Sequence, residues 1–158
     1  MNKAVFLDRD GTINIDKGYV YKLEDLEFLP GACNALKAFQ DAGFTLIVIT
    51  NQSGVGRGYY TMKDVEKFNN YLNKKLNSLG INITDFFICP HKPEDSCNCR
   101  KPSPYLINEA IRKYNIDPQK SFMFGDKSSD VQLGENANIQ SYLITEKENL
   151  AYWANKLL

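Results

Sequence analysis

The chain alternates short apolar runs with longer stretches in which apolar residues recur at three- and four-residue steps. Short apolar runs of this kind are typical of buried strands, and the longer periodic stretches are typical of amphipathic helices. We therefore expect five strands, at residues 4–7, 46–49, 86–88, 122–124 and 142–144.

The clearest helix signal follows residue 60. Thr61 and Asp64 have the spacing of a capping box, and Gly80 marks the expected end of the helix. Between these signals, apolar residues recur on one helical face. They are Val65, Phe68, Leu72, Leu76 and Leu79.

Two further helices are expected, one over residues 32–42 and one that begins at Ser103. Helices that separate apolar strands indicate parallel crossovers, which cover a sheet on both faces. The pattern therefore predicts a three-layer, Rossmann-like α/β fold as a single domain over residues 1–158. Residues 11–30 are polar, aromatic and irregular, and we expect them to form a flap over the site.

Composition and charge narrow the function classes. The 158 residues include 19 basic and 19 acidic side chains, so no broad positive field favours nucleic acid or an anionic membrane surface. No apolar run reaches the length of a membrane span, and acids occur too early for a secretory signal. We therefore expect a cytoplasmic protein that acts as a monomer, with its four cysteines present as thiols or metal ligands.

Polar residues follow three of the predicted strands directly. The first strand ends in Asp8-Arg9-Asp10-Gly11-Thr12, the second in Thr50-Asn51-Gln52-Ser53-Gly54, and the fourth in Gly125-Asp126-Lys127. A single such junction would be read as a helix cap. Three junctions should converge at the carboxyl edge of a parallel sheet, where clustered carboxylates favour a hard divalent cation. The sequence therefore predicts a Mg²⁺ site.

Three cysteines and the only histidine lie within eleven residues, as Cys89, His91, Cys97 and Cys99. Three thiolates and one imidazole suit a closed, tetrahedral Zn²⁺ site of structural type. Free thiols beside a surface histidine would leave this concentration unexplained. We predict a zinc-binding loop that stiffens the chain just before Arg100.

Four ordered motifs resemble those of the haloacid dehalogenase phosphatase superfamily. They are DRDGT from Asp8, TNQSG from Thr50, the lysine of RKP, and GDKSSD from Gly125. The resemblance spans residues 8–130. It implies a phosphoric monoester hydrolase with a minimal cap.

The resemblance also implies a role for each matching residue. Asp8 would be the nucleophile, and Asp10 would protonate the leaving alcohol and later activate water. Thr50 and Lys101 would bind the phosphoryl oxygens. Mg²⁺ would be held by the Asp8 carboxylate, the Asp10 backbone carbonyl and Asp126.

The zinc-binding loop narrows the resemblance to a bacterial branch with two substrate classes. DRDGTIN, DKGYV and TNQSGVGRG resemble enzymes that remove the 7-phosphate of D-glycero-D-manno-heptose 1,7-bisphosphate, a lipopolysaccharide precursor. The five-residue gap between His91 and Cys97, and the run DVQLGEN, resemble histidinol-phosphate phosphatases. We expect the phosphorylated sugar as substrate. The implied substrate contacts are Asp16, Lys17, Gly18, Tyr19, Thr50, Asn51, Gln52, Ser53, Arg100, Lys101 and Lys127.

Two non-enzymatic classes compete with this interpretation. A phosphoacceptor receiver domain also combines acids, a threonine and a lysine on a parallel sheet. Its phosphorylated aspartate normally follows the third strand, whereas the paired acids here follow the first. A zinc-ribbon nucleic-acid module would need a second ligand pair or a basic face, which this chain lacks.

Overall fold

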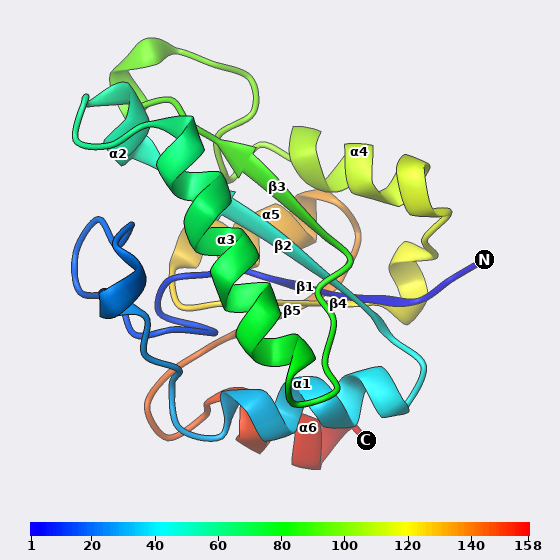
Figure 1. Cartoon of the computed structure of the whole chain (residues 1–158). Helices are drawn as coiled ribbons and strands as arrows, with labels where there is room; N and C mark the ends of the chain where they lie inside the picture. The colour runs from blue at the N-terminus through cyan, green and yellow to red at the C-terminus, as the bar shows by residue number, and fades with distance from the viewer.

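Five strands form one parallel sheet in the computed structural model, which describes residues 1–158 (Figure 1). The order across the sheet is β3-β2-β1-β4-β5, and every neighbouring pair is parallel. Each strand overlaps one of the predicted apolar runs, so the expected α/β fold is confirmed. The strands are β1 (Ala4–Leu7), β2 (Thr45–Asn51), β3 (Asp85–Cys89), β4 (Phe122–Gly125) and β5 (Gln140–Leu143).

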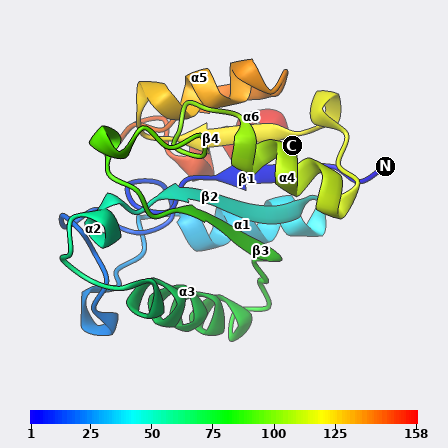
Figure 2. The same ribbon diagram turned by 90° about the horizontal axis from the view of Figure 1, so that it is seen from above.

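Helices cover both faces of the sheet, and Figure 2 shows α3 and α5 on opposite sides of it. None of the helices is both long and apolar enough to span a bilayer. The α-helices are α1 (Ala32–Asp41), α2 (Ser53–Gly56), α3 (Met62–Asn77), α4 (Tyr105–Tyr114), α5 (Ser128–Asn136) and α6 (Leu150–Leu157). Three short 3-10 helices are η1 (Leu23–Asp25), η2 (Pro93–Asp95) and η3 (Pro118–Lys120).

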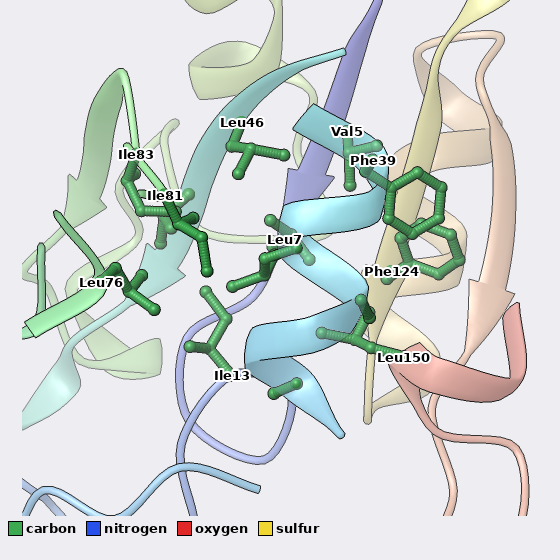
Figure 3. Close-up of a cluster of buried hydrophobic side chains, with 14 of the residues drawn as sticks. Val5, Leu7, Ile13, Phe39, Leu46, Leu76, Ile81, Ile83, Phe124 and Leu150 are labelled. Atoms are coloured by element: carbon green, nitrogen blue, oxygen red, sulfur yellow. The ribbon is translucent and has the colours of Figure 1, made fainter. Parts of the chain in front are cut away.

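The alternation of side chains along β1 divides the core into two layers. Val5 and Leu7 pack in a cluster with residues of α1, α3 and α6, part of which Figure 3 shows. Ala4 and Phe6 belong to a second cluster, with residues of α4 and α5. All four residues are fully buried, as expected for a central parallel strand that is covered on both sides.

The long helix begins where its sequence predicts. Thr61 Oγ1 accepts the Asp64 N–H, and Asp64 Oδ2 accepts the Thr61 N–H, which forms the expected capping box. The helix ends at Asn77, before the predicted last turn. Leu79 is therefore outside the helix and 54% exposed, because the chain turns at Gly80, whose φ is 78°.

Helix α4 begins at Tyr105, two residues after the predicted start at Ser103. Ser103 Oγ donates to the Asn98 carbonyl (2.6 Å) and accepts the Tyr105 N–H (3.4 Å). Ser103 therefore stays outside the helix and ties its first turn to the preceding loop.

Residues 11–30 form the irregular segment that the sequence predicts, with η1 as its only helical turn. The segment lies beside the chain that follows α2. Tyr19 packs edge-on against Tyr59, and Tyr21 stacks on Tyr60, with ring centroids 4.9 Å apart in both pairs. These contacts hold the segment, called the flap below, against the carboxyl edge of the sheet.

Candidate active site

Polar residues from three strand ends surround one cavity. Asp8 and Asp10 follow β1, Asn51 ends β2, and Lys127 follows β4. These strands are parallel neighbours, so their carboxyl ends lie at the same edge of the sheet. The cavity has a volume of about 440 Å³ and is lined by Asp8, Asp10, Asp16, Gly18, Tyr19, Asn51, Gln52, Ser53, Arg57, Tyr60, Pro93, Arg100, Lys101, Lys127 and Ser129.

Lys101 joins two carboxylates at the base of the cavity. Its Nζ donates to Asp8 Oδ1 (2.9 Å), to Asp130 Oδ1 (2.7 Å) and to the Ile49 carbonyl (3.1 Å). Lys101 and Asp8 are each 6% exposed and Asp130 is fully buried, so water screens these charges little. The three donated bonds use all the hydrogens of the ammonium group.

The acid cluster consists of Asp8, Asp126 and Asp130, and one carboxylate oxygen from each lies within 4.8 Å of the other two. Burial raises the pKa of Asp126 to about 6, and the negative charge of Asp8 adds to the shift. Burial also raises the pKa of Asp8 above its usual value, against the opposing charge of Lys101. Asp8 and Asp130 together raise the pKa of Lys101, despite its burial. The cluster thus has more acids than its single lysine neutralises.

This arrangement fits a divalent cation. Asp126 Oδ1 is buried and has no hydrogen-bond partner, which is costly unless the atom meets a ligand. The acid cluster groups three carboxylates, the oxygen ligands that a small hard cation such as Mg²⁺ prefers. A cation here would also offset the excess negative charge. The residues present therefore fit the Mg²⁺ expected from the sequence.

Asp130 is the member of the acid cluster to which the sequence motifs gave no role. It lies in the first turn of α5, and its Oδ2 accepts the Lys127 N–H (3.1 Å) as part of a capping box. Its other oxygen meets Lys101. Asp130 could have been predicted from the sequence, because it follows Asp126 by four residues in GDKSSD. That spacing brings both acids to the same strand end.

A glycine brings the loop after β1 close to the acid cluster. Gly11 has a φ of 84°, and a Cβ atom at this position would lie 2.2 Å from Asp126 Oδ2. A side chain would therefore displace Asp126 as well as strain the backbone. Glycine is therefore required at position 11, because the backbone there passes so close to the Asp126 carboxylate.

The Asp10 carboxylate is separate from the acid cluster and receives four donors. Arg9 Nε and Asn14 Nδ2 donate to Oδ1, at 3.0 and 2.9 Å. Arg9 Nη2 and Gln52 Nε2 donate to Oδ2, at 3.1 and 3.3 Å. Asp10 also lines the cavity, so its side chain is held in one orientation beside Asp8.

Most of the predicted substrate contacts line the cavity, and two do not. Thr50 is 1% exposed, and its Oγ1 accepts Gln52 Nε2 at 3.0 Å. Lys17 does not line the cavity, and its Nζ pairs with Glu27 Oε1 at 3.2 Å. The cavity wall also includes residues that were not predicted as contacts. They are Arg57, Tyr60, Pro93 and Ser129.

The four predicted zinc ligands lie together, with Cys89 at the end of β3 and the other three in the loop that follows it. Cys89 Sγ lies 3.7 Å from His91 Nδ1 and 3.5 Å from Cys97 Sγ, and Cys99 Sγ lies 3.5 Å from His91 Nδ1. Thiolates around a tetrahedral zinc lie about 3.8 Å apart. Cys89 and Cys99 are closer, with sulfur atoms 2.8 Å apart, and both are free thiols. The ligand types and their grouping fit Zn²⁺.

The backbone of the same loop stabilises a thiolate and connects it to the cavity. Burial opposes ionisation, but the Cys99 N–H, the Cys89 thiol and the Arg100 N–H lower the pKa of Cys97 to about 7. Arg100 and Lys101 follow Cys99 directly, and both line the cavity. The Lys101 N–H donates to Asn51 Oδ1 (3.2 Å), which fixes the loop against the end of β2.

Comparison with known proteins identifies the superfamily. A family model described as "HAD-hyrolase-like" matches residues 98–155. A D-glycero-beta-D-manno-heptose-1,7-bisphosphate 7-phosphatase from Helicobacter pylori is 50% identical over 144 residues, which cover 90% of this chain and 83% of that protein. The chain belongs to the haloacid dehalogenase superfamily. The resemblance in its motifs is therefore confirmed, and the protein is a phosphoric monoester hydrolase.

Two further members of this superfamily extend the comparison. A D-glycero-alpha-D-manno-heptose-1,7-bisphosphate 7-phosphatase from Photorhabdus laumondii is 42% identical over 144 residues, which cover 87% of this chain and 79% of that protein. The crystal structure of D,D-heptose 1,7-bisphosphate phosphatase from B. bronchiseptica, complexed with magnesium and phosphate, aligns with a TM-score of 0.90. It is 29% identical, and the alignment covers 98% of this chain and 97% of that one.

Proposed function

We propose that this enzyme removes the 7-phosphate of D-glycero-D-manno-heptose 1,7-bisphosphate by two displacements, through an aspartyl phosphate on Asp8. The observation that carries the proposal is the pairing of Asp8 with Lys101 at the base of a cavity that Asp10 also lines. The names of the relatives support the choice of sugar.

In the first displacement, a carboxylate oxygen of Asp8 attacks phosphorus, and the bond from phosphorus to the sugar oxygen breaks. Asp10 gives its proton to the departing alkoxide, which leaves as the alcohol. The Lys101 ammonium lies beside the phosphoryl oxygens, where it offsets their charge as the group is transferred. The Thr50 hydroxyl accepts from Gln52 Nε2 and keeps its own hydrogen, which it would donate to a phosphoryl oxygen.

In the second displacement, water attacks the phosphorus of the aspartyl phosphate. Asp10, now ionised, takes a proton from this water, and the bond to the Asp8 oxygen breaks to release phosphate. The four donors around Asp10 suit the ionised form that this step requires.

The proposed cofactors act in separate places. Mg²⁺, held by Asp8, Asp126 and the Asp10 carbonyl, with Asp130 beside them, supplies charge neutralisation at the phosphoryl group when bound. Zn²⁺, held by Cys89, His91, Cys97 and Cys99, would stiffen the loop that positions Arg100 and Lys101. It has no chemical role in the proposal, since all four of its ligands come from the protein.

A bisphosphate presents a second dianion, which cations away from the acid cluster must meet. Arg57, Arg100 and Lys127 line the cavity and could meet it. A histidinol phosphate has no second phosphate, so these cations favour the sugar. We place the reaction in the synthesis of nucleotide-activated heptose for lipopolysaccharide. We also propose that the enzyme acts as a monomer in the cytoplasm, where cysteine ligands stay reduced.

Phosphate release from a substrate panel tests the proposal. The panel contains both anomers of heptose 1,7-bisphosphate, histidinol phosphate and mannose 6-phosphate, each assayed with Mg²⁺. We expect the highest kcat/KM for a heptose bisphosphate, and phosphorus NMR should show loss of the 7-phosphate with retention of the 1-phosphate. Equal or faster turnover of histidinol phosphate would contradict the proposed substrate, and a lasting phosphoprotein without turnover would favour a receiver domain.

A further inference from the structure

Arg9 is a fully buried cation to which neither the sequence motifs nor the proposed mechanism gives a role. It lies in DRDGT between the two acids Asp8 and Asp10. A guanidinium without exposure to water must have its charge and donors satisfied by the protein. The position of its partners therefore indicates what the side chain does.

The donors of Arg9 connect three parts of the molecule. Nε and Nη2 form a fork on the two oxygens of Asp10, at 3.0 and 3.1 Å. Nη2 also donates to the Val20 carbonyl of the flap (2.8 Å), and Nη1 donates to Asn69 Oδ1 of α3 (3.0 Å). The guanidinium carbon lies 4.4 Å from the centre of the Phe68 ring, also on α3. Contacts on three sides leave the guanidinium little freedom to move.

The fork makes the two oxygens of Asp10 unequal. Oδ1 accepts Arg9 Nε and Asn14 Nδ2 at 3.0 and 2.9 Å, which occupy both of its lone pairs. Oδ2 accepts Arg9 Nη2 at 3.1 Å and only the longer bond from Gln52, at 3.3 Å. Both oxygens accept two bonds, but the Gln52 bond to Oδ2 is the longest of the four, so Oδ2 is the oxygen that can most readily exchange a donor for a proton of its own.

We infer that Arg9 is a positioning residue, which holds the Asp10 carboxylate so that Oδ2 faces the leaving oxygen of the substrate. Through the Val20 carbonyl, Arg9 also couples this orientation to the flap. The inference rests on the proposed role of Asp10 as the proton donor. Arg9 itself touches neither the substrate nor the reacting atoms in this assignment.

The choice of leaving group separates positioning of an acid from general structural support. A sugar alkoxide needs a proton in order to leave, whereas p-nitrophenolate leaves readily without one. The value of kcat/KM reports the steps up to the first irreversible one, which here is formation of the aspartyl phosphate. The ratio of kcat/KM for heptose 1,7-bisphosphate to that for p-nitrophenyl phosphate therefore measures how well the acid is placed.

Arg9→Lys keeps the positive charge but lacks the fork, since a lysine presents one nitrogen instead of two. We expect it to lower kcat/KM for the heptose bisphosphate at least about tenfold, and that for p-nitrophenyl phosphate less than about threefold. Asn69→Ala removes a partner of Arg9 without touching Asp10, so it should shift the ratio in the same direction by a smaller factor. This second variant keeps the test decisive if Arg9→Lys does not fold.

Leu72→Val is the matched control, because Leu72 is buried on α3 and belongs to the core cluster instead of the site. It should lower the melting temperature and leave the ratio unchanged. Equal losses for both substrates in the Arg9 and Asn69 variants would overturn the inference. Asp10→Asn shows the largest effect that misplacing the acid can have. If this variant also lowers kcat/KM equally for both substrates, the acid role of Asp10 in the proposed function is wrong. Histidinol phosphate replaces the heptose ester if the panel shows it to be the better alkyl substrate.

Discussion

Lys101 Nζ lies 2.9 Å from Asp8 Oδ1, although the two residues are 93 positions apart in the sequence. The contact joins the end of β1 to the loop that carries the proposed zinc ligands, because Lys101 follows Cys99 by two residues. The loop that we propose to bind zinc thus delivers the cation that faces the proposed nucleophile. Loop rigidity and the placement of charge at the site are therefore linked.

Lys101→Met should reduce both activity and stability. Without the ammonium, Asp8 and Asp130 become buried carboxylates that lack their shared partner, which costs about 3 kcal/mol of unfolding free energy. The value of kcat/KM should fall by roughly a hundredfold or more, since a cation at the phosphoryl group is lost. Urea unfolding in Mg²⁺-free buffer and steady-state kinetics with Mg²⁺ measure the two effects.

Asp130→Asn provides the control for the ion pair between Lys101 and Asp130. In the double variant with Lys101→Met, one buried charge is removed together with the lysine, so the protein should be more stable than with Lys101→Met alone. If the double variant is the less stable of the two, the lysine does not act by neutralising the acid cluster.

Asp8→Asn should prevent formation of the aspartyl phosphate, because an amide is not the nucleophile that the first displacement needs. Asp10→Asn should still form it slowly and should also slow its hydrolysis. Rapid-quench trapping with labelled substrate distinguishes the two variants. A phosphorylated Asp8→Asn protein would show that another residue is the nucleophile.

The sequence predicted the sheet well because its signals there are local. The three central strands β1, β2 and β4 are apolar runs that are largely buried, and the Thr61–Asp64 capping box depends on two side chains three residues apart. Helices α5 and α6 were not predicted. The segment SSDVQLGEN of α5 contains only two apolar side chains, Val131 and Leu133, so its helical period is weak. It is stabilised by contacts at its first turn and with β5, which no local pattern reveals.

The sequence predicted the site residues that belong to a motif at the end of a strand. It did not predict side-chain contacts between residues that are far apart in the sequence. Arg9 meets Asn69, which is 60 residues away, and Lys101 meets Asp130, which is 29 residues away. Lys17 lies in a motif that resembles a substrate contact, and in the structure its ammonium pairs with Glu27 of the same flap. Such pairings depend on the course of the flap and loops, which hydrophobic periodicity does not determine.

Asp85 should make the stability of the protein depend on acidic pH. Partial burial opposes ionisation, but hydrogen bonds from Tyr114 OH (2.5 Å) and Lys113 Nζ (2.9 Å) lower the pKa of Asp85 below 3.8. A lowered folded-state pKa stabilises the protein above pH 3.8, and this contribution is lost as the pH falls through the folded value. Asp85→Asn should therefore cost at most about 1 kcal/mol at pH 7, because the partly exposed site is screened.

Urea titrations of the wild type and Asp85→Asn between pH 7 and pH 3 test this sign. The difference in unfolding free energy should shrink towards the acidic end. A difference that grows as the pH falls would mean that the carboxyl is held in its neutral form. Glu66→Gln, which removes an exposed acid of α3, is the control for a general change in net charge.

Purified protein should contain one tightly held zinc ion per chain, as the single Cys/His cluster predicts. Cys97→Ser should lose zinc and lower kcat/KM, because Arg100 and Lys101 are no longer held in place. Cys33→Ser is the matched control, since Cys33 is a half-buried cysteine of α1 outside the cluster. Elemental analysis under reducing, chelator-free conditions measures the metal. Zinc-free wild type, or equal zinc loss in both variants, would contradict the assignment of the loop.

Arg100 is the residue through which we expect the enzyme to prefer a bisphosphate. Its side chain lines the cavity, and Nη1 lies 3.4 Å from the His91 carbonyl, a long contact that a phosphate could replace. A lost charge-assisted contact of about 1.5 to 3 kcal/mol corresponds to a fall of roughly ten- to a hundredfold in kcat/KM. Arg100→Ala should therefore cost this much for heptose 1,7-bisphosphate and much less for mannose 6-phosphate.

The control for Arg100→Ala is Arg112→Ala, which removes an exposed cation of α4 and should leave both values unchanged. Zinc content should also stay at the wild-type level in Arg100→Ala, because the alanine keeps the backbone N–H that faces Cys97. An equal loss for the bisphosphate and the monophosphate would mean that Arg100 acts on the transferred phosphate or on the loop. A loss confined to the bisphosphate would place the second phosphate beside Arg100, since only that substrate has a group for the missing cation to meet.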